Sequence, residues 1–361
     1  MSIPLLPHLY LPVRNLLHPL FDPAWRYRHA NLIHAVRVAL GLLTSIALTS
    51  GLHFPHGEWA SITLLVVIGG LQHHGNIRRK AGDRALGTLI GAAVGLLVLL
   101  LQAWLQIPLL SYLLIVVACG ICAYHAIGKG GYIALLSAIT ILIVAGHGEN
   151  AISDGLWRSV NVLFGIAIAL LFSFALPLYA TYSWRYRLAD LLRSCGKTYA
   201  AITGHATVSK AELQRMMLSQ GSLLVGLRTL MPSFAKETNI SALQLEEIQH
   251  SLRISVSLLE VLAAISPAFD DVEAQAFLQR RLGGEQQHLR DTLIDMAHAL
   301  RSGAVADLQP RDGVSNARLD VQLPDPEPTR LTGYVSLTVQ LLNEFDGLRG
   351  RLTAIADRWN V

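Results

Sequence analysis

Three arginines stand at the edges of long apolar stretches of this 361-residue chain. Arg37 is followed by VALGLLTSIAL, Arg84 begins a run that ends at residue 101, and Arg158 begins a run that ends at residue 171. A carboxylate that enters hydrocarbon needs a positive partner at that depth, and a guanidinium can hold it through two parallel hydrogen bonds. These arginines are therefore candidate contacts for an organic anion.

Two of these arginines also have a structural explanation. Arg84 could extend its side chain to the lipid headgroups. Asp154 lies four residues before Arg158, which is the spacing of an ion pair on one helix face. The basic cluster at 78–80 needs no binding role, because a basic loop on one side of a membrane accounts for it. The sequence leaves both interpretations open for Arg84 and Arg158.

The composition places much of the chain in lipid. Hydrophobic residues make up 52% of it and charged residues only 15%, and the mean hydropathy is +0.43. Such values are too apolar for a water-soluble protein of this length. The formal net charge of +4 could suggest nucleic acid, but the basic residues lie beside apolar runs rather than on one soluble face. We therefore expect a lipid bilayer around the chain and no nucleic-acid partner.

Six apolar stretches are candidates for transmembrane helices. They lie near residues 32–52, 58–74, 85–105, 109–127, 131–147 and 155–177. The sequence thus predicts an all-α, polytopic membrane domain of six transmembrane helices over 32–178. Four prolines break the apolar start of the chain, residues 1–21. We expect the segment 1–31 to lie along the cytoplasmic membrane surface and not to be a signal peptide.

The short connections between these stretches alternate in charge. Lys or Arg occurs before the first stretch, between the second and third, between the fourth and fifth, and after the sixth. The connections 53–57, 106–108 and 148–154 contain neither residue. Because basic connections stay on the cytoplasmic side of a membrane, both termini are expected in the cytoplasm.

From about residue 179 onward, charged residues alternate with apolar ones at helical spacing. Segments with this periodicity cover 184–203, 209–231, 241–265, 274–302 and 332–358. In the fourth segment, one apolar stripe consists of Leu282, Leu289, Leu293, Met296 and Leu300. The Pro-containing, charged stretch 303–331 has the composition of a flexible linker. These features predict a C-terminal cytoplasmic helical bundle over 179–361.

Motifs for catalysis and metal binding are weak. Cys119 and Cys122 match the redox pattern Cys-x-x-Cys but lie inside an apolar stretch, where packing explains them. Five residues at the predicted outer face could form a metal or proton site or be ordinary solvated residues: His53, His56, Glu58, His147 and Glu149. No catalytic triad, paired carboxylates or phosphate-binding loop is recognisable. We therefore expect neither an enzyme nor a bound cofactor or metal.

Glycines follow Arg84 at every fourth position. Gly87, Gly91 and Gly95 fall on one stripe of a helix and allow a second backbone to approach closely. The passage RSVNVLFGIAIALL repeats RALGTLIGAAVGLL at six of fourteen positions, 74 residues later, with Gly165 in the place of Gly91. We expect all four glycines to pack helices together.

The two repeated passages start on opposite sides of the predicted membrane, because they belong to the third and sixth spans. Two halves of three spans each would then be related by inversion, an architecture found in transporters. The middle span of each half is also the weakest: WASITLLVVIGGL and GYIALLSAITILIVAG. Short, glycine-ended spans at matching places indicate a translocation site. His73 and His74, directly after the first of them, are further candidate pathway residues.

The source of energy is not determined by these residues. The spans carry no Asp or Glu away from their ends, so the buried carboxylate relay of many proton-coupled carriers is missing. A negative interior favours outward movement of one anionic charge by ~2.3 kcal/mol per 100 mV. The alternative source of energy is proton coupling, for which His34, His73 and His125 are among the candidate residues.

Three short motifs resemble the fusaric acid resistance and aromatic acid exporter family. They are Arg37 with VALGLLTSIAL, Trp59 and Thr63 in EWASITLLVVI, and above all Arg84-x-x-Gly87-Thr88-x-x-Gly91. The resemblance covers roughly residues 30–180. The sequence KETN at 236–239 is similar to that of bacterial inner-membrane members with a cytoplasmic helical tail.

This resemblance implies an exporter or channel for organic anions, in particular aromatic carboxylates. Trp59 and Thr63 join the arginines as candidate pathway residues on the same ground. Many bacterial members carry two six-span units in one chain, and distant plant relatives are dimeric malate channels, so the single unit here implies a homodimer. Another class of function stays open, namely a membrane scaffold without transport whose cytoplasmic bundle recruits partners or regulates another transporter.

Overall fold

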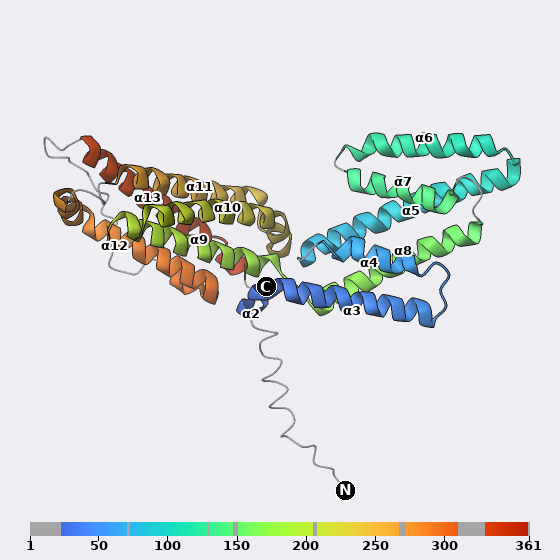
Figure 1. Ribbon diagram of the computed structural model, residues 1–361, viewed down its shortest axis with the longest axis horizontal. Helices are drawn as coiled ribbons and strands as arrows, with labels where there is room; N and C mark the ends of the chain where they lie inside the picture. The colour runs from blue at the N-terminus through green and yellow to red at the C-terminus, as the bar shows by residue number, and fades with distance from the viewer. Residues whose placement is uncertain are drawn as a thin grey trace, which may run out of the picture. The chain divides into compact units, whose positions relative to one another are not determined.

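The computed structural model describes residues 23–70, 73–128, 130–146, 151–204, 208–266, 272–309 and 329–359. Every regular element in these ranges is a helix. The chain divides into two compact units, Met1–Tyr179 (unit 1) and Ala180–Val361 (unit 2) (Figure 1). Most of the N-terminal segment 1–31 and of the linker 303–331 lies outside the described residues.

Unit 1 contains one helix for each predicted span. After the short helix α2 (Pro23–Arg28) come α3 (Ala30–Gly51), α4 (Glu58–Ile68), α5 (His74–Leu105), α6 (Pro108–Ala126), α7 (Gly131–Ala145) and α8 (Ile152–Ala175). The helices α3, α5, α6 and α8 are long and apolar enough to cross a membrane. The all-helical, polytopic class is therefore confirmed.

The two middle spans are shorter than their predicted ranges. Helix α4 has 11 residues and α7 has 15, which at 1.5 Å per residue gives about 16 and 22 Å. A full crossing of the hydrocarbon core takes ~30 Å. Gly69 follows α4 and Gly146 follows α7, the latter in the left-handed region with φ 59°. Among the described helices of unit 1, four rather than six thus have the length of a full span.

Helix α5 begins at His74, eleven residues before the predicted start at residue 85. The basic cluster at 78–80 thus lies on the helix, and its assignment to a loop is wrong. Arginine, lysine and alanine favour helix, so the polar stretch continues the helical backbone of the apolar run. Arg79 adds an ion pair with Asp83, one turn later, at 3.8 Å.

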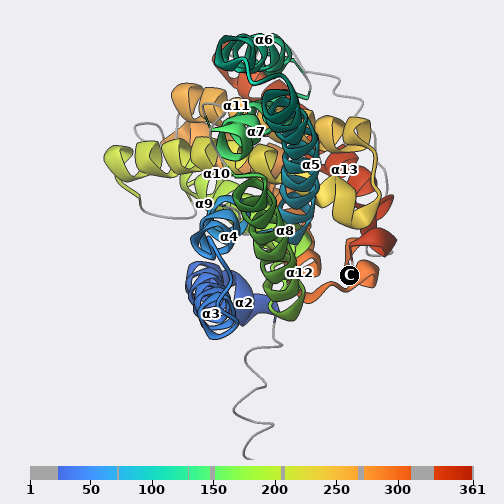
Figure 2. The same cartoon turned by 90° about the vertical axis from the view of Figure 1, so that its right-hand side faces the viewer.

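The helices of unit 1 surround a central pair. Helices α5 and α8 pack against each other, α7 packs on α5, and α4 packs on α8. Helix α6 contacts α5 and α7, whereas α3 contacts α4 and α8, so α3 and α6 lie at opposite edges of the unit (Figures 1 and 2). Exchanging α3, α4 and α5 with α6, α7 and α8 reproduces the same set of contacts. This pattern is the one expected from two repeats of three helices.

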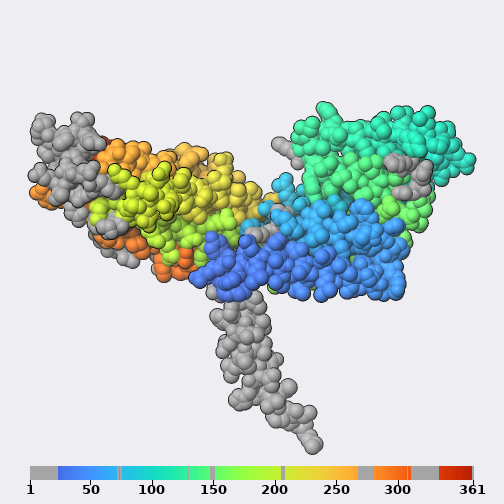
Figure 3. All heavy atoms as spheres, viewed as in Figure 1, coloured from blue at the N-terminus to red at the C-terminus, as the bar shows by residue number. Residues whose placement is uncertain are grey.

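The outer faces of the edge helices are apolar. Exposed side chains include Leu32 and Leu43 on α3 and Leu109, Val116 and Ile121 on α6. In the space-filling view, α3 (blue) runs along one edge of unit 1 and α6 (teal) along the other (Figure 3). Because a soluble protein rarely exposes apolar faces of this extent, these edges are suited to contact lipid.

Gly91 of α5 and Gly165 of α8 occupy equivalent contacts in the two halves. A Cβ atom at Gly91 would lie 2.5 Å from the Ser137 carbonyl oxygen of α7, and one at Gly165 would lie 2.2 Å from the Ala60 carbonyl oxygen of α4. The other glycines of the α5 stripe also face α7. Since a helix of the same chain covers this stripe, a homodimer, which stays a prediction, would need another surface.

Unit 2 is built from the helices α9 (Ala180–Ile202), α10 (Lys210–Thr238), α11 (Ala242–Ile265), α12 (Val272–Ser302) and α13 (Thr329–Thr353), with 3-10 turns at Val305–Leu308 and Ala356–Arg358. All members of the predicted stripe on α12 are buried. Helix α11 is apolar enough to be a membrane-span candidate by composition. Its buried side chains nevertheless belong to the core of unit 2.

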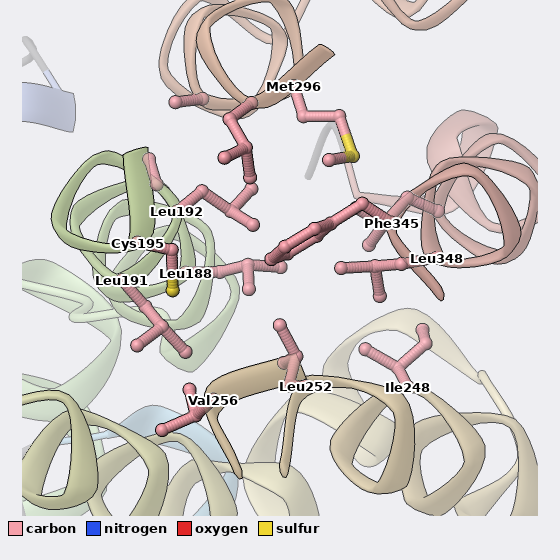
Figure 4. Close-up of a cluster of buried hydrophobic side chains, with 14 of the residues drawn as sticks. Leu188, Leu191, Leu192, Cys195, Ile248, Leu252, Val256, Met296, Phe345 and Leu348 are labelled. Carbon is pink, nitrogen blue, oxygen red and sulfur yellow. The ribbon is translucent and has the colours of Figure 1, made fainter. Parts of the chain in front are cut away.

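The core of unit 2 joins side chains from all of the helices α9 to α13, and Figure 4 labels members from α9, α11, α12 and α13. Phe345 of α13 lies between Met296 of α12 and Leu188 of α9, with Leu252 of α11 on the other side of the cluster (Figure 4). Cys195 lies in the same core, and burial raises the pKa of its thiol to about 12. This thiol is therefore protonated and unreactive at neutral pH.

The KETN sequence lies where three helix ends meet. Glu237 of α10 accepts hydrogen bonds from the backbone amides of Ala180 and Thr181 at 3.0 and 2.9 Å and from the Thr181 hydroxyl at 2.9 Å. A carboxylate at this place satisfies amides that the first turn of α9 leaves without partners. Asn239 then ends α10 in the left-handed conformation, and Ser241 caps α11. The motif thus has a structural role in unit 2.

We expect Gly91→Ala to destabilise unit 1, because its Cβ would overlap a backbone oxygen and the Thr140 Cβ atom, both at 2.5 Å. Overpacking of this kind costs about 1–3 kcal/mol. Gly82→Ala on the same helix is the matched control, since no atom lies within 4 Å of its Cβ position. Thermal unfolding of the purified variants in detergent measures the difference. Equal melting temperatures would show that α5 and α7 are not closely packed here.

Candidate anion-binding site

Arg84 lies in the buried face of α5 and not at the membrane surface. Its side chain is 6% exposed, and Ala81, Thr88 and Gly91 on the same face are buried as well. These positions follow one another at helical spacings of three or four residues, so the guanidinium belongs to the face that meets α4 and α7. Arg78 and Arg79, in contrast, are exposed.

The guanidinium of Arg84 has few partners. Its Nη2 donates to the Thr63 hydroxyl of α4 at 3.4 Å, which is long for a hydrogen bond. Its Nε is buried and forms no hydrogen bond, and in the described part of the chain no carboxylate pairs with it. The neighbouring Asp83 is directed to Arg79 instead. Arg84 is thus a buried cation whose hydrogen-bonding capacity is largely unused.

Further polar groups converge on Arg84. The Thr88 hydroxyl, one turn along α5, is buried and makes no hydrogen bond within the described residues. Tyr132 of α7 lies close enough to Arg84 for its hydroxyl to interact electrostatically with the guanidinium. Lys80 lies one turn before Arg84, with Nζ 5.7 Å from the centre of the Tyr132 ring. Hydroxyl and cationic donors from α4, α5 and α7 therefore lie near Arg84.

Arg37 and Arg158 differ from Arg84 because each donates to a carbonyl at a helix end. Arg37 Nη1 donates to the Leu176 carbonyl, directly after α8, at 3.3 Å. Arg158 Nη1 donates to the Ile143 carbonyl, in the last turn of α7, at 2.8 Å. The last carbonyls of a helix have no partner within it, and basic side chains commonly satisfy them. Both arginines thus have a structural role in addition to any contact with a ligand.

The expected alternative for Arg158, an ion pair with Asp154, is not formed among the described residues. The Asp154 carboxylate instead lies 3.7 Å from the His56 ring. Arg84 and Arg158 also lie near opposite ends of α7, since Arg84 is close to Tyr132 and Arg158 binds at Ile143. Eleven residues of helix separate these positions by about 16 Å. The structure therefore does not bring these two arginines into a single site.

The remaining sequence candidates fall at different places. Thr63 is fully buried beside Arg84, whereas Trp59 packs at the edge of a core cluster of unit 1. His73 directly precedes α5 and is partly buried. The side chain of His74 lies outside the described part of the structure, as do His147 and Glu149.

Thr88 and Tyr132 were not among the site residues that the sequence predicted. Thr88 lies four residues after Arg84, so helical periodicity alone could have placed both on one face. Tyr132 carries no comparable signal, because its proximity to Arg84 results from the close packing of α7 on α5.

The fold and this site define a polytopic helical membrane protein with a buried cation between its helices. Residues 42–172 match the family described as fusaric acid resistance protein-like. This match covers most of unit 1 and confirms the resemblance of its motifs to the family.

Two curated relatives extend this finding. Inner membrane protein YeeA of Escherichia coli strain K12 is 29% identical over 281 residues, which cover 77% of this chain and 78% of the relative. The p-hydroxybenzoic acid efflux pump subunit AaeB of Escherichia coli O1:K1 is 33% identical over 127 residues, which cover 29% of this chain and 19% of that subunit. The family and the pump subunit support a role in membrane efflux or transport.

Neutralising the arginines should separate structural from ligand-binding roles. Arg158→Gln removes a charged hydrogen bond to the Ile143 carbonyl at the end of α7, which should lower the free energy of unfolding by about 1.5–3 kcal/mol. Arg84→Gln removes a buried charge without an acidic partner and should leave stability unchanged or raise it. Thermal unfolding in detergent, with chloride as the only anion, makes the comparison. A loss for Arg84→Gln as large as for Arg158→Gln would mean that Arg84 is structural.

Proposed function

We propose that the protein exports organic anions, in particular aromatic carboxylates, across a bacterial inner membrane, with Arg84 as the residue that contacts the carboxylate. The observation that carries this proposal is the buried Arg84 guanidinium, which has no carboxylate partner in the described part of the chain and an unused Nε donor. The match to the family and the similarity to an efflux pump subunit support it.

The energetics favour an anion at this point. Removing a guanidinium from water costs several kcal/mol unless an anion or hydrogen-bond acceptors compensate for it. Arg37 and Arg158 have backbone carbonyls as partners, whereas Arg84 has a long contact to the Thr63 hydroxyl and an interaction with Tyr132. A carboxylate would accept two parallel hydrogen bonds from the guanidinium and further ones from the hydroxyls of Thr63 and Tyr132. The anion would thus complete a site that the protein alone leaves incomplete.

The short helices α4 and α7 are suited to a pathway on both sides of this site. Each is shorter than the hydrocarbon core, and a helix that ends within the membrane needs a polar environment for its last backbone groups, such as a water-filled pathway. Outward movement of a monovalent anion would be favoured by the membrane potential, at ~2.3 kcal/mol per 100 mV. The proposal therefore needs no carboxylate relay in the spans.

Transport should depend on Arg84 and not on its exposed neighbour. Arg84→Gln is expected to reduce initial efflux of radiolabelled p-hydroxybenzoate from proteoliposomes by about ten- to a hundredfold, as for the loss of a charge-assisted bidentate contact. Arg84→Lys should restore part of the rate, because the charge returns without the planar fork. Arg78→Gln is the control, since its side chain is exposed on the same helix.

The proteoliposomes contain no protein other than this one, so that any flux is its own. Equal, mild effects of Arg84→Gln and Arg78→Gln at matched protein levels would place the anion elsewhere. Absence of flux for any organic anion tried with wild-type protein would favour the scaffold function, in which unit 2 recruits partners.

In the membrane, the protein is oriented with both termini in the cytoplasm under this proposal. In a cysteine-free background, a cysteine that replaces exposed His53, before α4, should react with an impermeant maleimide added to intact cells. A cysteine that replaces exposed Gly82 on α5 should react only after the membrane is opened. Labelling of the Gly82 position from outside would show that the orientation is opposite to the one proposed.

A further inference from the structure

The connection between α3 and α4 is attached to α8, although about 100 residues separate them in sequence. Asn161 of α8 donates to the Pro55 carbonyl at 2.7 Å. The Phe54 ring lies 5.7 Å from the rings of both Trp157 and Phe164, measured between centres. The connection belongs to the first three-helix half of unit 1 and α8 to the second, so these contacts join the two halves.

His56 adds an ionic contact at the same place. Its Nε2 lies 3.7 Å from the Asp154 carboxylate, in the first turn of α8, and its Nδ1 lies 3.7 Å from the Glu58 carboxylate, at the start of α4. The three side chains are 29%, 47% and 62% exposed for His56, Asp154 and Glu58, so solvent protons reach them. The imidazole therefore stands between one carboxylate from each half.

The backbone of this connection is held in an unusual conformation. His53 and His56 have φ values of 54° and 58°. Residues other than glycine rarely adopt this left-handed region, and such conformations persist only where surrounding contacts hold them. The contacts of Phe54, Pro55 and His56 to α8 provide that support, which indicates that the position of His56 is determined by the fold and not by its own preference.

We infer that His56, Glu58 and Asp154 form a proton-operated latch between α4 and α8, at the end of unit 1 where both helices begin. Protonated His56 attracts both carboxylates, whereas neutral His56 attracts neither. Histidine ordinarily changes its charge between about pH 5 and 8, and carboxylates stay ionised to about pH 4. The latch is thus closed in weakly acidic medium and is released as the pH rises.

Among the described residues, the other charged groups nearby do not replace the histidine. His53 lies on the same connection but is exposed and forms no ion pair among the described residues. Arg158, one turn after Asp154, is directed to the Ile143 carbonyl of α7. Closure holds α4 against α8, the helix pair that meets at Gly165 and the Ala60 carbonyl. A closed latch therefore restricts opening at this end, and export is slower when this side is acidic.

The first test needs no transport. Histidine 15N NMR of the purified full-length protein in nanodiscs gives the titration of His56, assigned by loss of its signal in His56→Asn. In the double variant Glu58→Gln, Asp154→Asn, the proton affinity of His56 should fall about two- to fivefold, as for half-exposed ion pairs. An unchanged titration would overturn the latch. Asparagine is the replacement because it tolerates the left-handed backbone.

The second test rests on the proposed function and measures p-hydroxybenzoate efflux from proteoliposomes at external pH 5.5 and 8, with a fixed internal pH. Efflux by wild-type protein should be about two- to fivefold slower at pH 5.5, and His56→Asn should remove this difference. His53→Asn, the matched control at the neighbouring left-handed position, should retain it. A pH dependence that persists in His56→Asn would overturn regulation by the latch, whereas absence of flux at both values would count against export and leave the NMR result to decide the latch.

Discussion

The close approach of helix backbones at glycines is the constraint on which the rest of unit 1 depends. Gly91 allows α5 to lie against the Ser137 carbonyl of α7, and Gly165 allows α8 to lie against the Ala60 carbonyl of α4. These contacts hold the two short helices against the longer ones, and the ends of the short helices could not face lipid without unsatisfied backbone groups. They also remove Arg84 from water, because α7 covers the face of α5 on which it lies. The burial of the Arg84 charge thus results from the close helix packing that the glycines allow.

The arginines that pack between helices in the described structure are of two kinds. Arg37 and Arg158 satisfy helix-end carbonyls in unit 1, and Arg185 does the same in unit 2 by donating to the Leu300 carbonyl at 3.0 Å. In each case the charge is compensated by backbone dipoles that would otherwise lack a partner. Arg84 receives no such compensation in the described structure. It resembles the others in sequence context, and only its partners distinguish it.

The two halves of unit 1 are alike in packing but not in chemistry. Gly91 and Gly165 make equivalent contacts, yet Arg84 faces hydroxyls while its repeat partner Arg158 caps α7. The ionic contact of His56 with Asp154 also joins one half to the other. An architecture of two related halves needs such contacts between them if both are to move in a coordinated way.

The sequence by itself determined the features that repeat along the chain. Hydropathy located a helix in each of six stretches and marked the middle one of each half as weak. Periodicity located the buried stripe of α12, and Arg84-x-x-Gly87-Thr88-x-x-Gly91 indicated the family. The four-residue spacing of Arg84 and Thr88 in this motif also places both side chains on one face of a helix. These are local properties, because in a helix of 3.6 residues per turn the spacing along the sequence determines which residues share a face. This holds whichever element packs against that face.

Tertiary structure decided which partner each of these faces meets. The sequence predicts a loop for the basic cluster at 78–80, between two apolar stretches. In the structure α5 includes this cluster, because its residues have high helix propensity. Asp154 stands at the right spacing for Arg158, yet contacts His56 across the fold. Tyr132 reaches Arg84 only because α7 packs on the glycines of α5. Contacts between residues distant in sequence depend on how helices pack, and no spacing along one helix contains that information.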